Sequence, residues 1–369
     1  NTMTNTTPSG FKPAPVEFCQ LGGSLGFSVD NALTLAVITR HGHEVAEDIQ
    51  FRVLRSHQEH LFHEGLKKLG LDTGSSDPVR CAKFHVLSNY LGGLNVRYGE
   101  GNGKAWVVYD TPYWMDSPWS PGISPVAIRP EHLYRTMEAW HANNGVMLGN
   151  PRLAYVQTQL VARGDACDAG YFFEADHDLD PSERMQLRFD EGIPKDLQLD
   201  PPQLDENIWP IERQAKAWRN FSVAYVGGRI FWLLNVLGEE QAIELLEHSI
   251  RITMLQNRQR LKTLCKIDGA ASPQRAAAYF AAWHEAWGDE VTTSENSDGS
   301  VQCAITRSRL HGVGEFAAPA DPLPISLELA INRACQTVIE YDCPGVQAIA
   351  TGSMQGETPS WSTEFRATN

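Results

Sequence analysis

The sequence predicts an α+β protein with two tandem homologous domains, each built of helices packed on an antiparallel sheet. The first observation is an internal repeat, because the chain matches itself at a displacement of 196 residues without a gap from Gly42 to Tyr113. The second is that each copy carries helical patterns followed by strand pairs with glycine-containing turns. Repeats of solenoid proteins are far shorter than this period, so the repeat indicates tandem domains.

Matching residues fix the register of the two copies. Most of the first copy falls on the second at the displacement of 196, and the offset slips to 192 toward the end of each copy. A small insertion in the first copy explains the slip, and the proline-rich stretch 114–130 supplies it. The matching pairs are Gly42 with Gly238, Phe84 with Phe280 and Gly103 with Gly299 at the first offset, and Gly164 with Gly356 and Phe173 with Phe365 at the second.

Local composition divides the chain into four parts. Residues 1–15 are polar and rich in proline and threonine, which is typical of a disordered tail. The first domain, which we expect to bear the site, covers 16–178, and the second, diverged domain covers 211–369. Between them, residues 179–210 are rich in aspartate and proline and predict a linker that lies over the surface.

Periodicity and turn residues give the order of elements in each copy. In the first copy, helices are expected over 44–69, 77–92 and 129–142, and strands over 94–98, 105–109, 153–162 and 169–175. The glycine-rich segment 99–103 predicts a hairpin turn between the first two strands. The second copy repeats this order, with helices expected over 239–266, 273–287 and 327–339 and strands over 301–306, 346–350 and 362–367.

The bulk composition favours a globular protein of the cytoplasm. Hydrophobic residues make up 42% of the chain and charged residues 21%, which argues against disorder. The net charge is -14 and no lysine- or arginine-rich stripe occurs, so a nucleic-acid partner is not expected. We expect no apolar run of the roughly 20 residues that a membrane span needs, and the N-terminal segment has no signal pattern.

Metal and disulfide chemistry find little support in the sequence. Seven cysteines at irregular spacings indicate reduced thiols. His57, His60 and His63 with nearby glutamates are the candidate zinc ligands, but on one helix His57 and His63 point about 120° apart, so the three cannot share one ion. A solvated polar helix face is the favoured interpretation. Because a phosphate-binding glycine loop is also missing, we expect no metal and no cofactor.

Toward the end of the first copy, Ala162-Arg163-Gly164 and Cys167-Asp168 precede the aromatic run Tyr171, Phe172 and Phe173. Together with Thr111-Pro112-Tyr113 and Gln157-Thr158-Gln159, these residues give residues 35–174 a pattern that resembles the L-2-amino-thiazoline-4-carboxylic acid hydrolase family. The chain would then be a tandem duplication of that unit with a diverged second copy. The resemblance implies hydrolytic opening of a small ring with C–N and C–S bonds. The sequence differs by Thr111 at a family cysteine position and by Trp140-His141-Ala142-Asn143-Asn144 on the helix that carries another.

Cys167, Asp165 and His141 are the candidate catalytic residues. The thiolate of Cys167 could attack an electrophilic carbon if His141 or Arg163 approached it and lowered its pKa. Two adjacent carboxylates favour the protonated thiol, so Asp165 or His141 activating water is an equal alternative. The structural alternative is that Gly164-Asp165 forms a hairpin turn and that Cys167 belongs to the core.

Substrate binding is assigned to aromatic and polar residues of the first copy. We expect Thr111 and Tyr113 to bind and polarise the substrate, and the other predicted binding residues are Trp114, Asn144, Thr158 and Asp168. The aromatic residues around the proline-rich insertion could line a pocket or form the domain core, and the insertion itself suggests a lid. The second copy would complete the pocket wall. The alternative is a site shared between the two copies, to which Cys335, Tyr341 and Asp342 would contribute.

The leading function is therefore hydrolysis of a non-peptide C–N bond in a small, possibly heterocyclic, molecule by the first domain. A small-molecule binding or sensing protein with the same aromatic pocket is the alternative from another class. A lyase or isomerase on the same scaffold is a third, since kinship of fold does not fix a reaction. The expected partners are a small-molecule substrate and, as an open alternative, a second copy of the chain in a homodimer.

Overall fold

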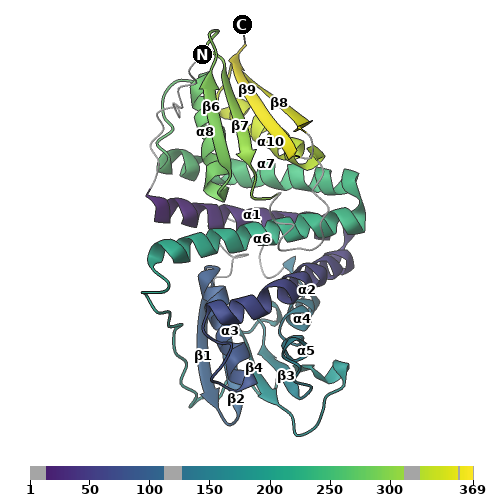
Figure 1. Ribbon diagram of the computed structural model, residues 1–369. Coiled ribbons are helices and arrows are strands. Elements are labelled where there is room, and N and C mark those ends of the chain that lie inside the picture. The colour runs from purple at the N-terminus through teal and green to yellow at the C-terminus, as the bar shows by residue number, and fades with distance from the viewer. Residues whose placement is uncertain (1–13, 112–126, 311–324, 356–357, 369) are drawn as a thin grey trace.

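The computed structural model describes residues 14–111, 127–310, 325–355 and 358–368 and confirms the α+β class (Figure 1). Two halves share an order of three helices, two strands, a helix and two further strands, to which the first half adds the short α5 and β5. An antiparallel sheet lies at each end of the molecule, and four long helices cross its middle. The predicted tail at residues 1–15 lies almost entirely outside the described residues.

The first half contains α1 (Pro15–His41), α2 (His43–Lys68), α3 (Asp77–Leu91), β1 (Asn95–Gly101), β2 (Lys104–Asp110), α4 (Pro130–Ala139), α5 (Asn144–Leu148), β3 (Leu153–Gln159), β4 (Cys167–Glu174) and the short β5 (Met185–Leu187). The second half contains α6 (Ile211–Leu237), α7 (Glu239–Leu264), α8 (Pro273–Trp287), β6 (Glu290–Glu295), β7 (Val301–Arg307), α10 (Ile325–Asp342), β8 (Val346–Gln355) and β9 (Thr358–Ala367). Most predicted helices and strands are confirmed, with small differences at their ends.

The two sheets share one strand order. The first runs β1-β2-β4-β3-β5 and the second β6-β7-β9-β8, and every pair is antiparallel except β3 with β5. Helices cover one face of each sheet. On the other face of the first sheet, Ile193 and Leu197 of the segment 179–210 pack against Trp106 and Tyr171. The segment that we expected to be a surface linker thus also shields a sheet.

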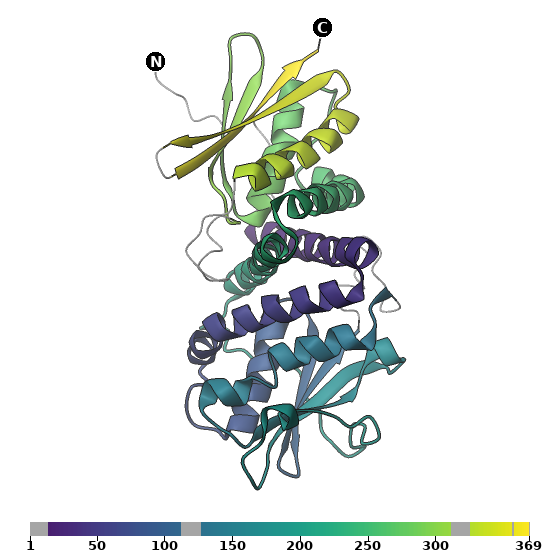
Figure 2. The same ribbon diagram turned by 90° about the vertical axis from the view of Figure 1, so that its right-hand side faces the viewer.

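The long helices α1 and α6 were not predicted, because neither has the alternation of apolar and polar faces that marks a surface helix. Both lie in the middle of the molecule, and α1 is buried on nearly all sides. Glycines allow α1 to approach its neighbours closely: a Cβ added at Gly26 would lie 2.3 Å from Ser222 Oγ of α6, and one at Gly22 would lie 1.8 Å from the carbonyl oxygen of Ala286 in α8. Helices α1 and α6 are side by side in both views (Figure 2).

The first helices of the two copies are exchanged between the halves. Figure 1 shows the order α7, α1, α6, α2, so α1 of the first copy lies next to α7 of the second, and α6 lies next to α2. Leu25 and Val29 of α1 belong to the core of the second half. In return, Trp232 of α6 donates a hydrogen bond to Ser56 of α2. Each half is therefore completed by a helix from the other copy.

One described helix, α1, is long and apolar enough to cross a membrane by length and composition, with a mean hydropathy of 1.3 over 18 residues. The expectation that no apolar run reaches this length is therefore wrong. The structure gives another reason for its composition, because 83% of that stretch is buried inside the molecule. A helix enclosed by protein on all sides needs apolar residues all round.

The strand register corrects the second offset of the repeat. Ala105 of β2 pairs with Phe172, and Val301 of β7 pairs with Phe365. The β2 and β7 residues differ by 301 − 105 = 196, whereas their β4 and β9 partners differ by 365 − 172 = 193. The predicted match of Phe173 with Phe365 is thus off by one residue, which would place the side chain on the opposite face of the sheet. Phe172 and Phe365 are both fully buried beneath the helices.

Candidate functional site

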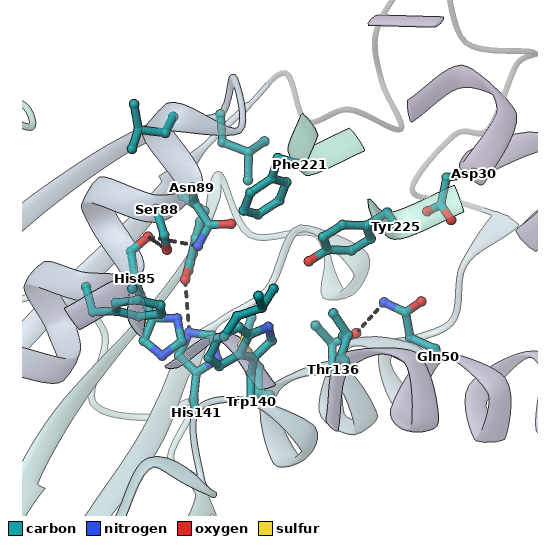
Figure 3. Close-up of a pocket in the computed structure, with 18 of the residues that line it drawn as sticks. Asp30, Gln50, His85, Ser88, Asn89, Thr136, Trp140, His141, Phe221 and Tyr225 are labelled. Atoms are coloured by element: carbon teal, nitrogen blue, oxygen red, sulfur yellow. Dashed lines mark hydrogen bonds between the residues drawn. The ribbon is translucent and has the colours of Figure 1, made fainter. Parts of the chain in front are cut away.

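A cavity of about 300 Å³ lies between the helical face of the first half and α6 (Figure 3). Its wall takes residues from α1, α2, α3, α4, β2, β4 and α6. The aromatic side chains of the wall are Phe84, Tyr109, Trp140, Trp209, Phe221 and Tyr225. The second copy contributes to this wall through α6, the helix that it exchanges into the first half.

The α6 side of the cavity is a single face of that helix. Ala217, Phe221, Tyr225 and Arg229 all line it, and they follow one another at intervals of four residues. Residues four apart in an α-helix lie on one face, one turn above another. The equivalents of the last three on α1, 196 residues earlier, are Leu25, Val29 and Leu33, which are fully buried aliphatic side chains of the other half.

A pair of stacked histidines forms one polar part of the wall. The rings of His85 and His141 lie 3.7 Å apart between centroids and within 10° of parallel. The Tyr109 hydroxyl lies 2.9 Å from Nε2 of His141, and the amide nitrogen of Asn144 donates to Nε2 of His85 over 2.8 Å. Both histidines are at most 5% exposed. The site therefore holds two imidazoles in fixed orientations.

Both imidazoles are uncharged at neutral pH. Burial, the largest cause, lowers the pKa of His85 to about 3, although its hydrogen bond with Asn144 acts in the opposite direction. Burial also lowers the pKa of His141 well below its usual value, and the neighbouring His85 adds to that shift. A neutral imidazole can accept a proton or a hydrogen bond at one ring nitrogen and donate at the other.

Asn144, predicted to bind substrate, positions a histidine instead. Its side chain is fully buried and does not line the cavity. The Asn144 side-chain oxygen accepts a 3.1 Å hydrogen bond from Gln58, whose own oxygen accepts a 2.6 Å hydrogen bond from Asn143. The amide network thus fixes the side chain that holds His85.

A buried ion pair forms the second polar part of the wall. Arg229 of α6 donates to both carboxylate oxygens of Asp30 in α1, at 2.5 and 3.1 Å, and also to Gln50 of α2 at 2.7 Å. Gln50 donates in turn to Thr136 of α4. Figure 3 shows Asp30, Gln50 and Thr136 of this network across the cavity from His85 and His141. Four helices from both copies therefore meet at one network.

Cys167 lies on the opposite face of the first sheet from the cavity. Successive side chains of β4 alternate between faces, so Asp168 lines the cavity while Cys167 packs with Val108 beneath Leu199. Burial, followed by the charge of Asp110, raises the pKa of Cys167 to about 11. His141 therefore does not approach Cys167, because the sheet stands between the two side chains, and this condition for an activated thiol is not met.

The other groups of the predicted catalytic segment have structural contacts. Asp165 accepts a 2.8 Å hydrogen bond from the backbone N–H of Leu160 and so closes the turn before β4. The guanidinium of Arg163 stacks over the ring of Phe189 at 3.7 Å, which takes it away from Cys167. This arrangement corresponds to the structural alternative of a hairpin turn followed by a core cysteine.

The remaining predicted binding residues are not gathered at the cavity, Asp168 excepted. Thr111 is exposed just beyond β2, and neither it nor Thr158 lines the cavity. The Thr158 hydroxyl donates to the backbone oxygen of Ala169 across the two strands. Tyr113 and Trp114, with the predicted lid, lie outside the described residues. Asp168 accepts a 2.8 Å hydrogen bond from the backbone N–H of Val161.

The alternative sites do not assemble around the cavity either. His57 is buried against Tyr225, whose ring lies 5.0 Å away, so the predicted solvated face is wrong for this residue. Within the described ranges, histidine, cysteine, aspartate and glutamate side chains form no cluster of metal-ligand type. Cys335 is buried, Tyr341 is exposed, and Asp342 accepts from Lys262, so these three do not form the shared site.

Comparison with known proteins leaves the family open. No family model, curated protein or solved structure matches the chain. The resemblance to the hydrolase family therefore stays a prediction that rests on the quoted residues. The site has to be interpreted from its own geometry.

The second copy has apolar residues where the first has its polar wall. With the corrected offsets, His85 corresponds to Ala281, Tyr109 to Ile305 and Asp168 to Trp361, and all three replacements are buried. The residues that sequence reasoning missed are Phe221, Tyr225, Arg229, His85 and His132. The available signal was this difference between equivalent positions of the two copies.

Proposed function

We propose that this protein binds a small, largely apolar molecule in the cavity between the first half and α6. The observation that carries the proposal is the composition of the wall, where aromatic rings surround a few fixed polar groups. Cavities of this size with such a lining are the common form of small-molecule sites. The preformed network around Arg229 and the held rings of His85 and His141 mean that little side-chain ordering is needed on binding.

The test is to fill the cavity from α6. Ala217 lines the cavity near its exposed end, so Ala217→Phe places a ring where the ligand would lie. A panel of small aromatic and heterocyclic compounds is screened by melting temperature and native mass spectrometry. Ligands of the wild type should lose at least tenfold in affinity in Ala217→Phe.

The matched control is the neighbouring residue on the exposed side of the same helix. Lys216 is exposed and does not line the cavity, so Lys216→Phe adds the same ring outside it. This variant should bind as the wild type does. Equal binding by both variants would contradict the proposed location, and a panel without any ligand would contradict the proposed function.

Hydrolysis of a C–N bond in this cavity is the second candidate, and a specific arrangement favours it. His141, Tyr109 and Asp168 all line the cavity, with the Tyr109 hydroxyl 2.9 Å from His141 Nε2. An uncharged imidazole can take a proton from water, and a tyrosine hydroxyl can donate to a developing oxyanion. In this scheme Cys167 takes no part, because it faces away from the cavity.

The hydrolase candidate is tested by product analysis on thiazoline, hydantoin and lactam compounds. Turnover should fall at least a hundredfold in His141→Ala and stay unchanged in Cys167→Ala. Loss of turnover in Cys167→Ala alone would favour the thiol mechanism against this one. Binding without product from any compound would leave the binding function as the better account.

A further inference from the structure

The cavity follows one face of α6, and we refer to it as the channel. Ala217 and Arg229 lie twelve residues apart on one face of α6, which corresponds to about 18 Å along the helix. Leu61 and Lys68 of α2, which is antiparallel to α6 here, lie beside the Ala217 end and are partly or fully exposed. At the other end, Arg229 is 2% exposed. A ligand would therefore enter beside Ala217 and extend toward Arg229.

Among its described wall residues, the channel offers an anionic ligand no unpaired cation. Arg229 is paired with Asp30 inside the channel, and Lys68 is paired with Glu64 outside it at 2.6 Å. The Asp168 carboxylate accepts from a backbone N–H. Burying an anionic group in such a channel would remove it from water without a counter-ion, which is strongly unfavourable.

The end of the channel beside Arg229, which we call the closed end because Arg229 and Asp30 are buried there, also contains His132. Within the described residues, Nδ1 of His132 is buried and makes no hydrogen bond, while the residue itself is 4% exposed. Burial lowers the pKa of His132 to about 3, and the charge of Arg229 adds to the shift. A buried polar atom is stabilised by a hydrogen-bond partner, and a ligand group that reaches the closed end would supply it.

We propose that the ligand is an elongated, largely apolar molecule without an anionic group, whose single hydrogen-bonding head reaches His132 at the closed end of the channel. The inference rests on the proposed binding function and adds the chemical class of the ligand and its direction. The apolar body would lie along Phe221 and Tyr225, with the head between α4 and α6.

Two fluorescent probes with the same ring system test the charge. N-phenyl-1-naphthylamine is neutral and elongated, and 1-anilinonaphthalene-8-sulfonate adds one sulfonate to the same skeleton. At pH 7.5 the neutral probe should bind the wild-type chain at least tenfold more tightly, and Ala217→Phe should abolish its binding while Lys216→Phe should not. Equal or tighter binding of the sulfonate would overturn the inference while the proposed function stood. Binding of neither probe would count against both.

A second pair of compounds tests the head group. 6-Phenyl-2-naphthol and 2-phenylnaphthalene differ only in one hydroxyl, and both are uncharged at pH 7.5. The wild type should prefer the naphthol by about tenfold, which corresponds to one hydrogen bond. His132→Leu should lose this preference and keep the affinity for the hydrocarbon, a result that a purely structural role would not give. A wild type that binds both compounds equally would refute the assignment of His132.

Discussion

At the scale of single residues, the first half is distinguished by buried histidines that are held uncharged. Burial is the largest cause that lowers the pKa of His57 to about 4 and that of His85 and His132 to about 3. Aromatic rings pack against two of them, since His57 contacts Tyr225 and His85 contacts Phe172. The apolar packing that buries these histidines is thus also the reason why their imidazoles are uncharged.

These histidines predict a protein that loses stability in mild acid. Their folded-state pKa values lie below the unfolded value of about 6.5, so the unfolded chain binds more protons as the pH falls. Their contribution is complete above pH 6.5 and is lost between pH 6.5 and about 3. At pH 5 each should reduce the free energy of unfolding by about 2 kcal/mol. Urea unfolding at several pH values measures this slope.

The control for the acid response is an exposed histidine. His63 is solvent-exposed and forms no ion pair among the described residues, so His63→Gln should leave the pH dependence of stability between 5 and 7 as it is. His85→Gln should make the dependence shallower, because it removes one group that the unfolded state protonates. If the free energy of unfolding depended on pH equally in both variants, the contribution of His85 to the acid response would be contradicted.

The cysteines give a second prediction at this scale. All seven are free and buried, and burial is the largest cause that raises the pKa of Cys167 to about 11. Because the thiolate is the reactive form, the native protein should show almost no reaction with a thiol reagent at pH 7.5. In urea all seven should react. A fast native reaction at Cys167, located by peptide mapping, would show an activated nucleophile instead.

At the scale of elements, the helices that the sequence predicts well are those with one apolar face and one polar face. The helices α2, α3 and α8 have turn residues and periodic apolar positions, and the predictions 44–69, 77–92 and 273–287 match them within one residue at each end. The hairpin turn between β1 and β2 is confirmed by the left-handed conformation of Asn102 and Gly103. The helices α1 and α6 escaped prediction because both faces of each contact protein, which removes the periodic signal.

The contact between α1 and its neighbours depends on glycines that have no room for a Cβ. At Gly22 the obstacle is the backbone of Ala286, which cannot move aside as a flexible side chain could. Gly22→Ala should therefore reduce the free energy of unfolding by about 1–3 kcal/mol, even though alanine favours helices. Glu17→Ala, an exposed change on the same helix, should have little effect. Urea unfolding that finds Gly22→Ala as stable as wild type would contradict the close packing.

At the scale of the whole molecule, the exchange of first helices explains why the sequence revealed the halves but not the site. The repeat predicts two copies, and each copy was expected to be a unit with its own core. In the structure, the wall of the cavity is shared between α2 and α6, whose facing residues His57 and Tyr225 lie far apart in the sequence. Local patterns cannot show such a pairing, since periodicity reports which face is buried and not which helix covers it.

The interleaved order α7, α1, α6, α2 predicts that the halves unfold together, and the Arg229–Asp30 pair provides the test. Both side chains are at most 8% exposed. Arg229→Met leaves Asp30 buried without its partner and should cost about 3–5 kcal/mol. Asp30→Leu combined with Arg229→Met should recover most of this loss, because no unpaired charge remains.

The matched control is a surface ion pair between the same two copies. Arg40 of α1 lies 2.7 Å from Glu244 of α7, and the two side chains are 35% and 70% exposed, so Arg40→Met should cost less than about 1 kcal/mol. Unfolding is followed by tryptophan fluorescence and by circular dichroism. Coincident curves for the wild type and for each variant are expected, since α1 and α6 cannot leave one half without exposing the other. Two separate transitions would mean that the halves are stable on their own and that the shared helices add little to either.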